Sequence, residues 1–378
     1  MRVLKLPELF IGILVQKVIN WSKIDRAIIN LAGEWMGLGD VIAASPLVYA
    51  IKSASPKCKI YLILTGDKWN SIVNLMEGAP QTINVKKSFY RLRELWIHGL
   101  LNLRRPWLRT AYFYDYMAPR YRASLLGFLI GAEFRFGYDQ NGMTREERPL
   151  HNTHNLPYNS IGINVFDYSN EFNCITNLKC SSSLHLAKNT LVDKGKILIN
   201  ALGIDCSKGL LAIHPGSSSN LQAKRWPTES FSKLAQILNS KYDISTLVIL
   251  GPDDKELRNS WKEETYVCFL DNDYSIYDIA AILTCCKCLI SNDSGIMNLG
   301  FSLGVPGIGL FGPTNSSKHD GWYPNSILIQ SKYNFVCPPC YGTDRYIKCA
   351  GIPPSCMESI TIDEVLEKLE GLLQKCAV

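Results

Sequence analysis

The sequence predicts an α/β protein built from two doubly wound parallel sheets that face each other across a central cleft. From Arg26 onward, short apolar runs alternate with longer amphipathic ones, which is the pattern of strands alternating with helices. Glycine-containing loops follow several of the short runs, as at the ligand-binding edge of doubly wound sheets. A chain of 378 residues is also long enough for two or three domains of ordinary size.

The first half is expected to start with a buried strand, a glycine loop and an apolar helix. Residues 86–137 are rich in aromatic side chains and arginine, whereas residues 138–183 show little periodicity and many Asn, Ser and Pro. We interpret 138–183 as loops and an interdomain connection. The expected elements are strands at 27–31, 60–64 and 111–114, and helices at 41–52 and 72–76.

The second half repeats the alternation from residue 184 onward. Its first helix is expected to end at Gly203, and its last to begin at the N-cap residue Thr361 with an acidic first turn. The expected helices are 186–202, 231–238, 276–283 and 361–375, and the strands are 210–214, 246–250, 288–290 and 307–311. The expected division is an amphipathic helix at 1–24, α/β domains at 25–183 and 184–360, and a C-terminal helix at 361–378.

Composition excludes several classes of protein. The chain is 47% apolar and 20% charged, which rules out collagen-like, coiled-coil and wholly disordered chains. Its 40 Lys+Arg and 34 Asp+Glu give a net charge of +6. This mild excess suits the binding of an anionic ligand but is smaller than expected for a nucleic-acid-binding protein. Thirteen cysteines without a dense framework, and no recognisable cleavage site after the first apolar stretch, favour a reduced, cytoplasmic compartment.

The N-terminal segment has apolar residues at helical spacing, from Leu6 to Val18. Its longest apolar run, 9–15, is far shorter than the ~20 residues that a membrane span requires. Two interpretations stay open for this amphipathic helix: it packs on the domain, or it contacts the cytoplasmic face of the inner membrane through nearby Lys5, Lys17 and Lys23.

The first loop with functional potential runs from Gly33 to Gly39 and leads into Asp40. Its glycines allow a tight turn between strand and helix. Asp40 lies where the helix begins, so it is either a helix cap or a general base held at the mouth of the cleft. No Gly-Lys-Ser/Thr follows, so this is not a Walker phosphate loop.

A second loop, with sequence HPGSSS at 214–219, follows an expected strand and includes Ser217. Small residues after a strand expose backbone N–H groups that can hold an anion. Lys224 and Arg225 then offer positive charge for a phosphate, and Trp226-Pro227 sets the start of the next helix. The alternative is an ordinary strand-to-helix loop with solvated charges.

A third pair of loops follows the strands at 288–290 and 307–311. Asp293 lies just past the first strand, and Ser294-Gly295 opens a helix whose N-terminal N–H groups favour a diphosphate. The segment Gly312-Pro313-Thr314 ends the next strand and is expected to close the same pocket. Together these loops favour a nucleotide site, although Asp293 is also a reasonable helix cap.

At these loops the sequence resembles the glycosyltransferase family 9 heptosyltransferases, which add heptose to lipopolysaccharide core. Order and spacing agree from about residue 26 to the C-terminus. The matching stretches are 39–41 with 46–47, then 214–216 with 224–227, and finally 290–295 through 303–306 to 310–314.

The resemblance implies a GT-B fold of two Rossmann-like domains, with an ADP-heptose-like donor in the C-terminal domain and a lipopolysaccharide-core or other glycan acceptor in the N-terminal one. It implies inverting transfer in one displacement, without a metal or other cofactor. Implied site residues are Asp40 as the base, Lys224 on the donor phosphates, Asp293 on the donor sugar, Ser294 and Gly295 on the diphosphate, Glu256 on the ribose, Ser217, Gly312 and Thr314 elsewhere in the donor pocket, and Gly39 on the acceptor side.

One departure from the family concerns Asn298, because the family usually has a histidine there. Asn can form hydrogen bonds but cannot carry a proton or a positive charge. Two alternatives therefore stay open: a glycosyltransferase with another nucleotide-sugar donor, and a non-catalytic nucleotide-sugar- or glycan-binding relative.

The acceptor surface is expected in the basic stretch between Lys86 and Arg122. It holds nine Lys or Arg but only Glu94 and Asp115 as acids, which suits an acceptor bearing phosphates or acidic sugars. Arg120 and Arg122 are the acceptor candidates, because they follow the expected strand at 111–114. The alternative is a solvated helix face with Trp96 and Trp107 in the core; no nucleic-acid-binding motif is present.

Four thiols near the C-terminus form a candidate metal site. Cys337 and Cys340 make a CxxC pair, and Cys349 and Cys356 follow within twenty residues. This pattern fits structural zinc or iron, or else free thiols.

Overall fold

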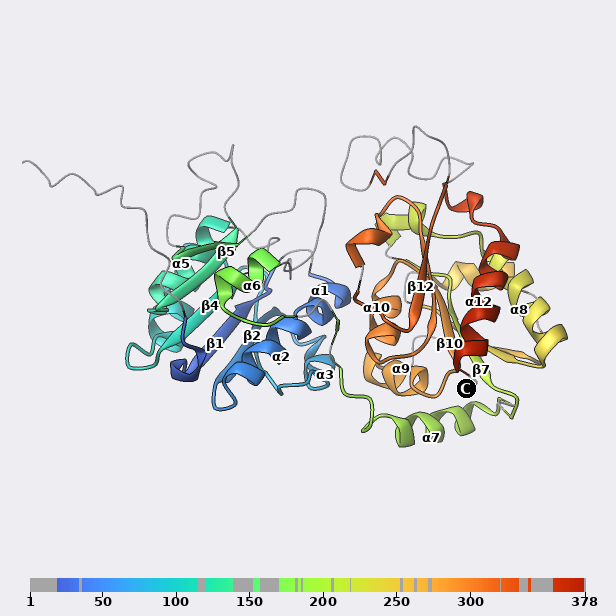
Figure 1. Ribbon diagram of the computed structural model, residues 1–378, viewed down its shortest axis with the longest axis horizontal. Helices are drawn as coiled ribbons and strands as arrows, with labels where there is room; N and C mark the ends of the chain where they lie inside the picture. The colour runs from blue at the N-terminus through green and yellow to red at the C-terminus, as the bar shows by residue number, and fades with distance from the viewer. Residues whose placement is uncertain are drawn as a thin grey trace, which may run out of the picture.

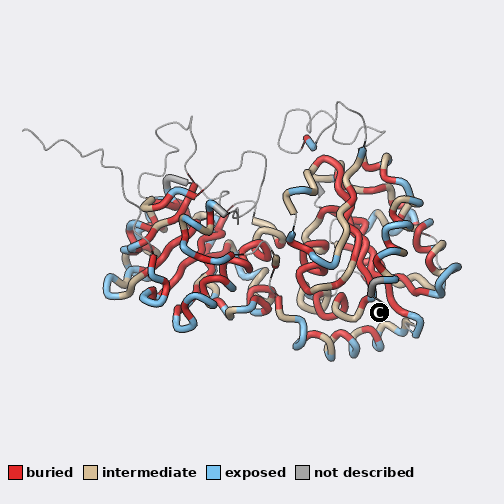
Figure 2. Tube along the Cα trace, in the orientation of Figure 1, coloured by how far each residue is buried: buried red, intermediate tan, exposed pale blue. Residues whose placement is uncertain are grey.

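The computed structural model describes most of the chain as two α/β halves lying side by side (Figure 1). The described residues are 19–33, 36–114, 120–138, 152–156, 170–180, 183–184, 186–204, 207–217, 219–251, 254–261, 264–270, 274–319, 321–332, 339–340 and 356–376. Each half has a six-stranded sheet. The strands run through the buried interior of each half, and exposed residues lie mainly on the surrounding helices and loops (Figure 2).

The first sheet is parallel throughout and has the order β3-β2-β1-β4-β5-β6. All residues of β1 and β4 are buried, as expected for parallel strands covered on both faces. Its strands are β1 Arg26–Asn30, β2 Lys59–Thr65, β3 Gln81–Val85, β4 Thr110–Tyr114, β5 Phe134–Tyr138 and β6 His154–Leu156.

The second sheet is also parallel, with the order β12-β11-β10-β7-β8-β9, and repeats the winding of the first. Its winding reverses between β7 and β10, where doubly wound sheets bind ligands beyond the carboxyl ends of the strands. The strands are β7 Leu210–His214, β8 Ser245–Ile249, β9 Val267–Leu270, β10 Cys288–Asn292, β11 Gly307–Phe311 and β12 Ser326–Gln330.

Helices cover both sheets. In the first half they are the 3-10 turn η1 Trp21–Lys23, α1 Leu38–Ala43, α2 Ser45–Ala54, α3 Asn70–Val73, α4 Leu92–Trp96, the π-helix η2 Ile97–Leu103, α5 Arg120–Leu129 and α6 Asn170–Thr176. In the second half they are α7 Val192–Leu202, α8 Thr228–Tyr242, α9 Ile276–Leu283, α10 Gly295–Ser302 and α12 Ile362–Cys376, with the 3-10 turns η3 Ser219–Lys224, η4 Lys255–Ser260, η5 Ser316–His319 and η6 Cys356–Ser359.

The helices depart from the sequence prediction at three places. The expected helix at 41–52 is two helices that meet at Ala44, because Pro46 has no N–H to donate to the preceding turn. The helix expected at 72–76 is the single turn of α3, at Asn70–Val73. The helix expected at 186–202 begins only at Val192, since Leu186 forms a β-bridge with Met76 instead.

The segment interpreted as loops, 138–183, contains a strand and a helix. Its strand β6 is only three residues long, too short for an alternating pattern to be recognised. Of the expected N-terminal helix, residues 1–18 lie outside the described residues. Trp21 at its end is buried and donates its indole N–H to the Thr176 carbonyl at 2.8 Å. The domain boundaries stay a prediction.

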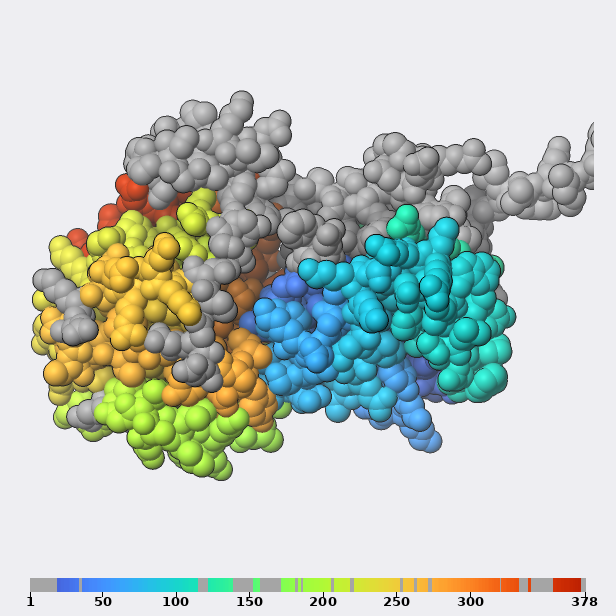
Figure 3. Space-filling view, turned by 180° about the vertical axis from the view of Figure 1, so that it is seen from behind, coloured from blue at the N-terminus to red at the C-terminus, as the bar shows by residue number. Residues whose placement is uncertain are grey.

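The two halves touch through short helices and one crossing segment. The Ala187 N–H donates to the Leu75 carbonyl at 2.7 Å beside the Met76–Leu186 bridge. Helix α1 of the first half packs on α10 of the second, where a Cβ on Gly295 would lie 3.0 Å from the Leu38 Cβ. From behind, the blue segment of the first half contacts the orange segment of the second (Figure 3). Within the described residues, no helix combines the length and apolarity needed to cross a membrane.

Two helical glycines give a matched test of the packing in the second half. A Cβ on Gly195 of α7 would lie 2.2 Å from the Ala281 carbonyl oxygen of α9, whereas one on Gly371 of α12 would meet nothing within 4 Å. Gly195→Ala should therefore lower the free energy of unfolding by about 1–3 kcal/mol through overpacking. Gly371→Ala should raise it by about 0.5–1 kcal/mol through helix propensity. Urea denaturation measures both, and changes of the same sign would contradict this packing.

Candidate active site

A cavity of about 660 Å³ lies between the two halves, beyond the carboxyl ends of the central strands. Its lining combines residues that follow β1 and β2 in the first half with residues that follow β7, β8, β9 and β10 in the second: Met36, Gly37, Leu38, Gly39, Asp40, Lys68, Trp69, His214, Ser217, Leu221, Lys224, Leu250, Gly251, Asp254, Tyr274, Ile276, Ile279, Asp293, Ser294, Gly295, Ile296 and Asn298. A smaller cavity of about 180 Å³ shares Gly39, Asp40, Lys224, Asp293 and Asn298 with it. The three loops singled out in the sequence therefore converge on one site.

Asp40 both caps a helix and faces the cavity. Its Oδ2 accepts the Gly37 N–H at 2.7 Å at the start of α1, which fixes the carboxylate in place. Burial raises the pKa of Asp40, and the Gly37 N–H and the charge of Lys224 oppose this rise only in part. The carboxylate is thus oriented, half-buried and more basic than an ordinary aspartate.

Lys224 and Asp293 form a buried ion pair at the centre of the site. Lys224 Nζ lies 2.8 Å from Asp293 Oδ2, and each side chain is only 10% exposed. The same Oδ2 accepts the Thr314 hydroxyl at 2.7 Å. Burial alone would raise the pKa of Asp293, but Lys224, His319 and Thr314 hold it below its ordinary value. Asp293 is therefore a fixed negative charge beside a lysine.

The loop that carries Lys224 is held by Asn292, the last residue of β10. The Asn292 Oδ1 accepts the Trp226 N–H at 2.9 Å, and its Nδ2 donates to the Pro215 carbonyl at 2.8 Å. The Trp226 indole N–H donates to the Ile360 carbonyl at 2.8 Å, which anchors the Trp226 side chain as well as its backbone. One buried amide thus joins the loop after β7 to the end of β10.

Arg225, which was expected from its charge to contact a phosphate, forms an ion pair within the second half. Its Nη2 lies 2.8 Å from Asp254 Oδ1 and also donates to the Ser217 backbone oxygen at 2.9 Å. Asp254 in turn packs on Gly216, where a Cβ would lie 2.0 Å from its Oδ2. Burial lowers the pKa of His214, which keeps this cavity-lining ring neutral.

Ser294 and Gly295 open α10 toward the cavity. The Ser294 hydroxyl accepts the Met297 N–H at 3.2 Å, so this residue is the helix N-cap. The helix therefore presents its positive dipole end at the same wall as Lys224.

Comparison with known proteins identifies the family. The model of glycosyltransferase family 9 (heptosyltransferase) matches residues 120–349. The chain belongs to glycosyltransferase family 9. It is 24% identical over 343 residues to lipooligosaccharide heptosyltransferase 2 of Campylobacter jejuni, covering 89% of this chain and 96% of that protein.

Solved structures of family members share the fold of this transferase. The glycosyl transferase family 9 protein of Veillonella parvula superimposes with a TM-score of 0.70 at 20% identity, covering 95% of this chain and 99% of that one. The ADP-heptose lipopolysaccharide heptosyltransferase II of E. coli gives 0.68 at 16% identity, covering 94% and 100%. The predicted GT-B fold is confirmed.

Asn298, where the resemblance implies a histidine, is built into the wall of this transferase's site. Its Nδ2 donates to the Ser294 carbonyl at 3.1 Å, and its Oδ1 accepts the Tyr323 hydroxyl in a short hydrogen bond. A Cβ on Gly39 would lie 2.7 Å from that Nδ2, so the two halves meet closely at this point. Gly39 thus has a packing reason to be glycine.

Other expected site residues lie elsewhere. Glu256 is exposed on η4 and does not line the larger cavity, whereas Asp254, two residues earlier, does line it. Gly312 packs against Met357, with a Cβ position 2.4 Å from its Sδ, whereas Thr314 lines the smaller cavity. Arg120 begins α5, but its side chain lies outside the described residues.

Two lysines at the cavities were missed in the sequence. Lys318, whose pKa is lowered by burial and by nearby Lys224, lines the smaller cavity. Lys68 lines the larger one, with its Nζ 4.4 Å from the Trp69 ring centroid. The sequence could have indicated Lys68 only through its position, because it follows β2 at the edge of the sheet where ligands bind.

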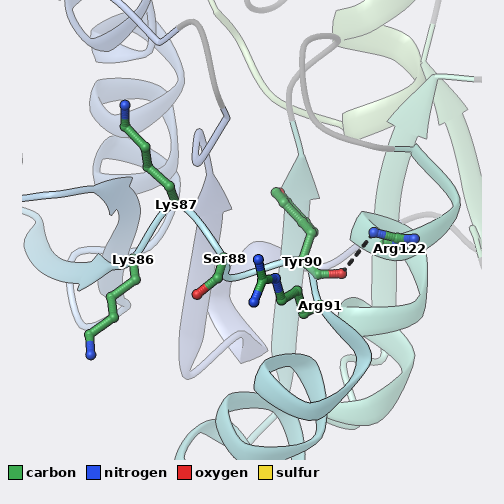
Figure 4. A pocket seen from close by; sticks show the side chains of 6 residues that line it. All are labelled: Lys86, Lys87, Ser88, Tyr90, Arg91 and Arg122. Atoms are coloured by element: carbon green, nitrogen blue, oxygen red, sulfur yellow. Dashed lines mark hydrogen bonds between the residues drawn. The ribbon is translucent and has the colours of Figure 1, made fainter.

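A separate basic pocket of about 460 Å³ lies in the first half, where β3 ends near the start of α5. It is lined by Lys86, Lys87, Ser88, Tyr90, Arg91 and Arg122 (Figure 4). Arg122 donates to the Tyr90 carbonyl at 3.2 Å, which ties α5 to the segment after β3. Arg122 therefore lies among basic residues, as the sequence led us to expect.

The cysteine cluster stays a prediction. Cys340 is buried and Cys356 is half-buried, whereas Cys337 and Cys349 lie outside the described residues. In the part of the chain that the structure describes, no group of three or more His, Cys, Asp and Glu side chains is arranged to hold a metal.

Replacing Lys224 by Met should destabilise the transferase in a pH-dependent way. In the wild type the lowered pKa of Asp293 contributes stability above about pH 4, which is lost as pH falls through the folded value. Without Lys224, burial raises this pKa, so the variant instead loses stability as pH rises through it. The loss should reach about 3–5 kcal/mol at pH 7 and be smaller at pH 4.

Urea denaturation across this pH range measures the difference between wild type and variant. Lys241→Met is the matched control, since Lys241 pairs with Glu370 at the surface and should cost little. A loss from Lys224→Met that is equal at pH 4 and pH 7 would contradict the charged state of Asp293.

Proposed function

We propose that this family 9 enzyme transfers heptose from ADP-heptose to a lipopolysaccharide-core acceptor, with inversion at the anomeric carbon and Asp40 as general base. One observation supports this most. A carboxylate with a raised pKa, from the first half, and the cation Lys224, from the second half, line the same cavity. A base on one side and positive charge on the other are what an acceptor hydroxyl and a leaving diphosphate require.

The donor is assigned to the second half, residues 184–360. Lys224 and the N-terminus of α10 at Ser294 and Gly295 favour the diphosphate, with Lys318 near the Lys224–Asp293 pair. We assign Asp293, which lines the same wall, to accept hydrogen bonds from hydroxyls of the donor sugar. Glu256 stays the prediction for the ribose. The names of the relatives, which include ADP-heptose and lipopolysaccharide, support this choice of donor.

The proposed reaction is a single displacement. The acceptor hydroxyl oxygen attacks the anomeric carbon, the carbon–oxygen bond to the diphosphate breaks, and Asp40 takes the hydroxyl proton. ADP leaves with the bonding electrons, and its charge is offset by Lys224 and the end of α10. This arrangement needs no metal for the transfer step, because protein cations occupy the place of a Lewis acid.

The acceptor is assigned to the first half, residues 25–183. The basic pocket supplies Arg122, Arg91 and two lysines for phosphates or acidic sugars, and Gly39 lines the cavity beside Asp40. Arg120 stays a prediction beside Arg122. Such an acceptor is lipid-linked, so we place the reaction at the cytoplasmic face of the inner membrane.

Asp40→Asn should lower kcat by about 10²–10⁴-fold while the fold is kept. The Asn Oδ1 can still accept the Gly37 N–H, so the start of α1 is preserved. In the wild type, kcat/KM should rise with pH through the raised pKa of Asp40, above the usual carboxyl range near about 3.9. Asp67→Asn, at an exposed acid after β2, is the control with full activity. Full turnover by Asp40→Asn would remove the base assignment.

ADP should raise the melting temperature more than UDP or GDP at equal concentration. A ligand that binds only the folded state stabilises it by about 2.7 kcal/mol at a hundredfold excess over its Kd. Lys224→Met should weaken ADP binding by about 10–100-fold, because a charge-assisted hydrogen bond to phosphate is lost. Calorimetry gives the Kd values. A preference for UDP or GDP would replace the donor, and no response to any of the three would favour a non-catalytic relative.

A further inference from the structure

An exposed apolar surface lies on the outer helical layer of the first half. Five of the eight large apolar side chains that are exposed among the described residues belong to this surface. We call it the α4–α5 face: Leu92 and Trp96 of α4, Leu101 of η2, Trp107 in the loop before β4, and Phe128 of α5. The segment that carries these residues forms the cyan and teal outer surface in Figure 3.

Helix α4 carries apolar side chains both at the core and at the surface. Leu95 is fully buried, whereas Leu92 and Trp96, four residues apart on an adjoining face, are 59% and 53% exposed. Leu101 and Trp107 are 73% and 72% exposed, although burial of Trp96 and Trp107 in the core was one expectation from the sequence. The core of this half is therefore complete without these outward side chains.

The helical layer is one packed unit. A Cβ on Gly99 of η2 would lie 2.9 Å from the Leu129 Cβ of α5, so the two helices touch without a side chain between them. Phe128, next to Leu129 on α5, is 53% exposed. Arg135 lies over the Phe128 ring, 6.0 Å from its centroid.

Positive charge borders this surface. Residues 86–108 contain six Lys or Arg and a single acid, Glu94, which lies 4.0 Å from His98. Lys86, Lys87, Arg91, Arg93 and Arg104 are exposed. Exposed tryptophan and leucine among arginines are the side chains that suit the boundary between lipid headgroups and acyl chains.

We propose that the α4–α5 face docks this protein on the surface of an anionic lipid bilayer. Leu101, Trp107 and Trp96 insert among the headgroups, and the bordering cations pair with lipid phosphates. A bilayer suits the surface because its apolar side chains are exposed and the charge around them is mostly positive, with Glu94 as the single acid in residues 86–108.

The docking face adjoins the basic pocket, because Arg91, which lines that pocket, directly precedes Leu92. Docking would therefore hold the pocket at the level of the lipid headgroups. That this delivers a lipid-linked acceptor rests on the proposed function, whereas the docking itself does not.

The test is co-sedimentation of the full chain with vesicles of phosphatidylcholine, with or without about 30% phosphatidylglycerol. The wild type should bind the anionic vesicles at least about tenfold more tightly than the zwitterionic ones, and lose this binding as salt rises. Leu101→Ser with Trp107→Ser should weaken binding to anionic vesicles at least about tenfold. Arg93→Gln with Arg104→Gln should weaken it similarly.

Matched controls use equally exposed side chains of the second half. Ile197→Ser replaces an apolar residue that is 68% exposed on α7, and Lys196→Gln with Lys233→Gln removes two exposed cations. These variants should bind vesicles like the wild type. All variants should keep the ADP response in thermal shift, which separates a failure of docking from a failure of the proposed function.

Three results would overturn the proposal. One is that the wild type binds both kinds of vesicle equally well, or binds neither of them. Another is wild-type binding by the Leu101/Trp107 variant, which would move the membrane contact to another part of the chain. The third is a self-associated wild type that becomes monomeric in this variant without any vesicle binding, which would assign the face to a second copy.

Discussion

The active site depends on a buried ion pair between two loops that lie far apart in the sequence. Lys224 and Asp293 are 69 residues apart, yet they meet at 2.8 Å with little exposure to water. Removing two charges from water is costly unless they are paired and hydrogen-bonded, and here Thr314 supplies a further bond. Asn292 joins the same two segments through the backbone at Pro215 and Trp226. The ends of the strands are therefore fixed by polar contacts, because these buried polar groups would be left unpaired in another arrangement.

Close packing also fixes the contact between the two halves. Short helices from each half approach closely because Gly39 and Gly295 have no side chains, so Asn298 and Leu38 fill that space. Asp40 is brought near Lys224 only through this contact, and its pKa is shaped by both halves. The chemistry that we propose is thus a property of the junction, because neither half holds both the base and the cation.

The first half also has an exposed apolar surface, the α4–α5 face, which lies apart from the candidate site. The layer formed by α4, η2 and α5 closes the core with Leu95 and Leu103 and still exposes Leu92, Trp96 and Leu101. A layer that is apolar on both sides costs solubility unless its outer side serves a contact. Here the outer side borders basic residues and adjoins the pocket assigned to the acceptor. Catalysis at the junction and docking on this face would be compatible, since they use different surfaces of the same half.

Local patterns in the sequence were enough to predict the doubly wound fold and the loops that line the candidate site. Central parallel strands such as 210–214 and 307–311 are continuous apolar runs bounded by glycine loops, and this local pattern is sufficient to place them. Asp40, Lys224 and Asp293 were singled out in the sequence as polar residues in loops after such strands, and the structure brings them to one cavity.

The pairing of charges and the exposure of apolar side chains could not be predicted from local patterns and follow from the folded chain. Arg225 is bound by Asp254, and Lys318 lies near the site, through contacts between residues far apart in the chain. Trp96 and Trp107 have the composition of core residues, and only the packing of the helical layer shows that they face outward. Local periodicity reports what a residue prefers, whereas burial and pairing depend on neighbours that the fold brings together.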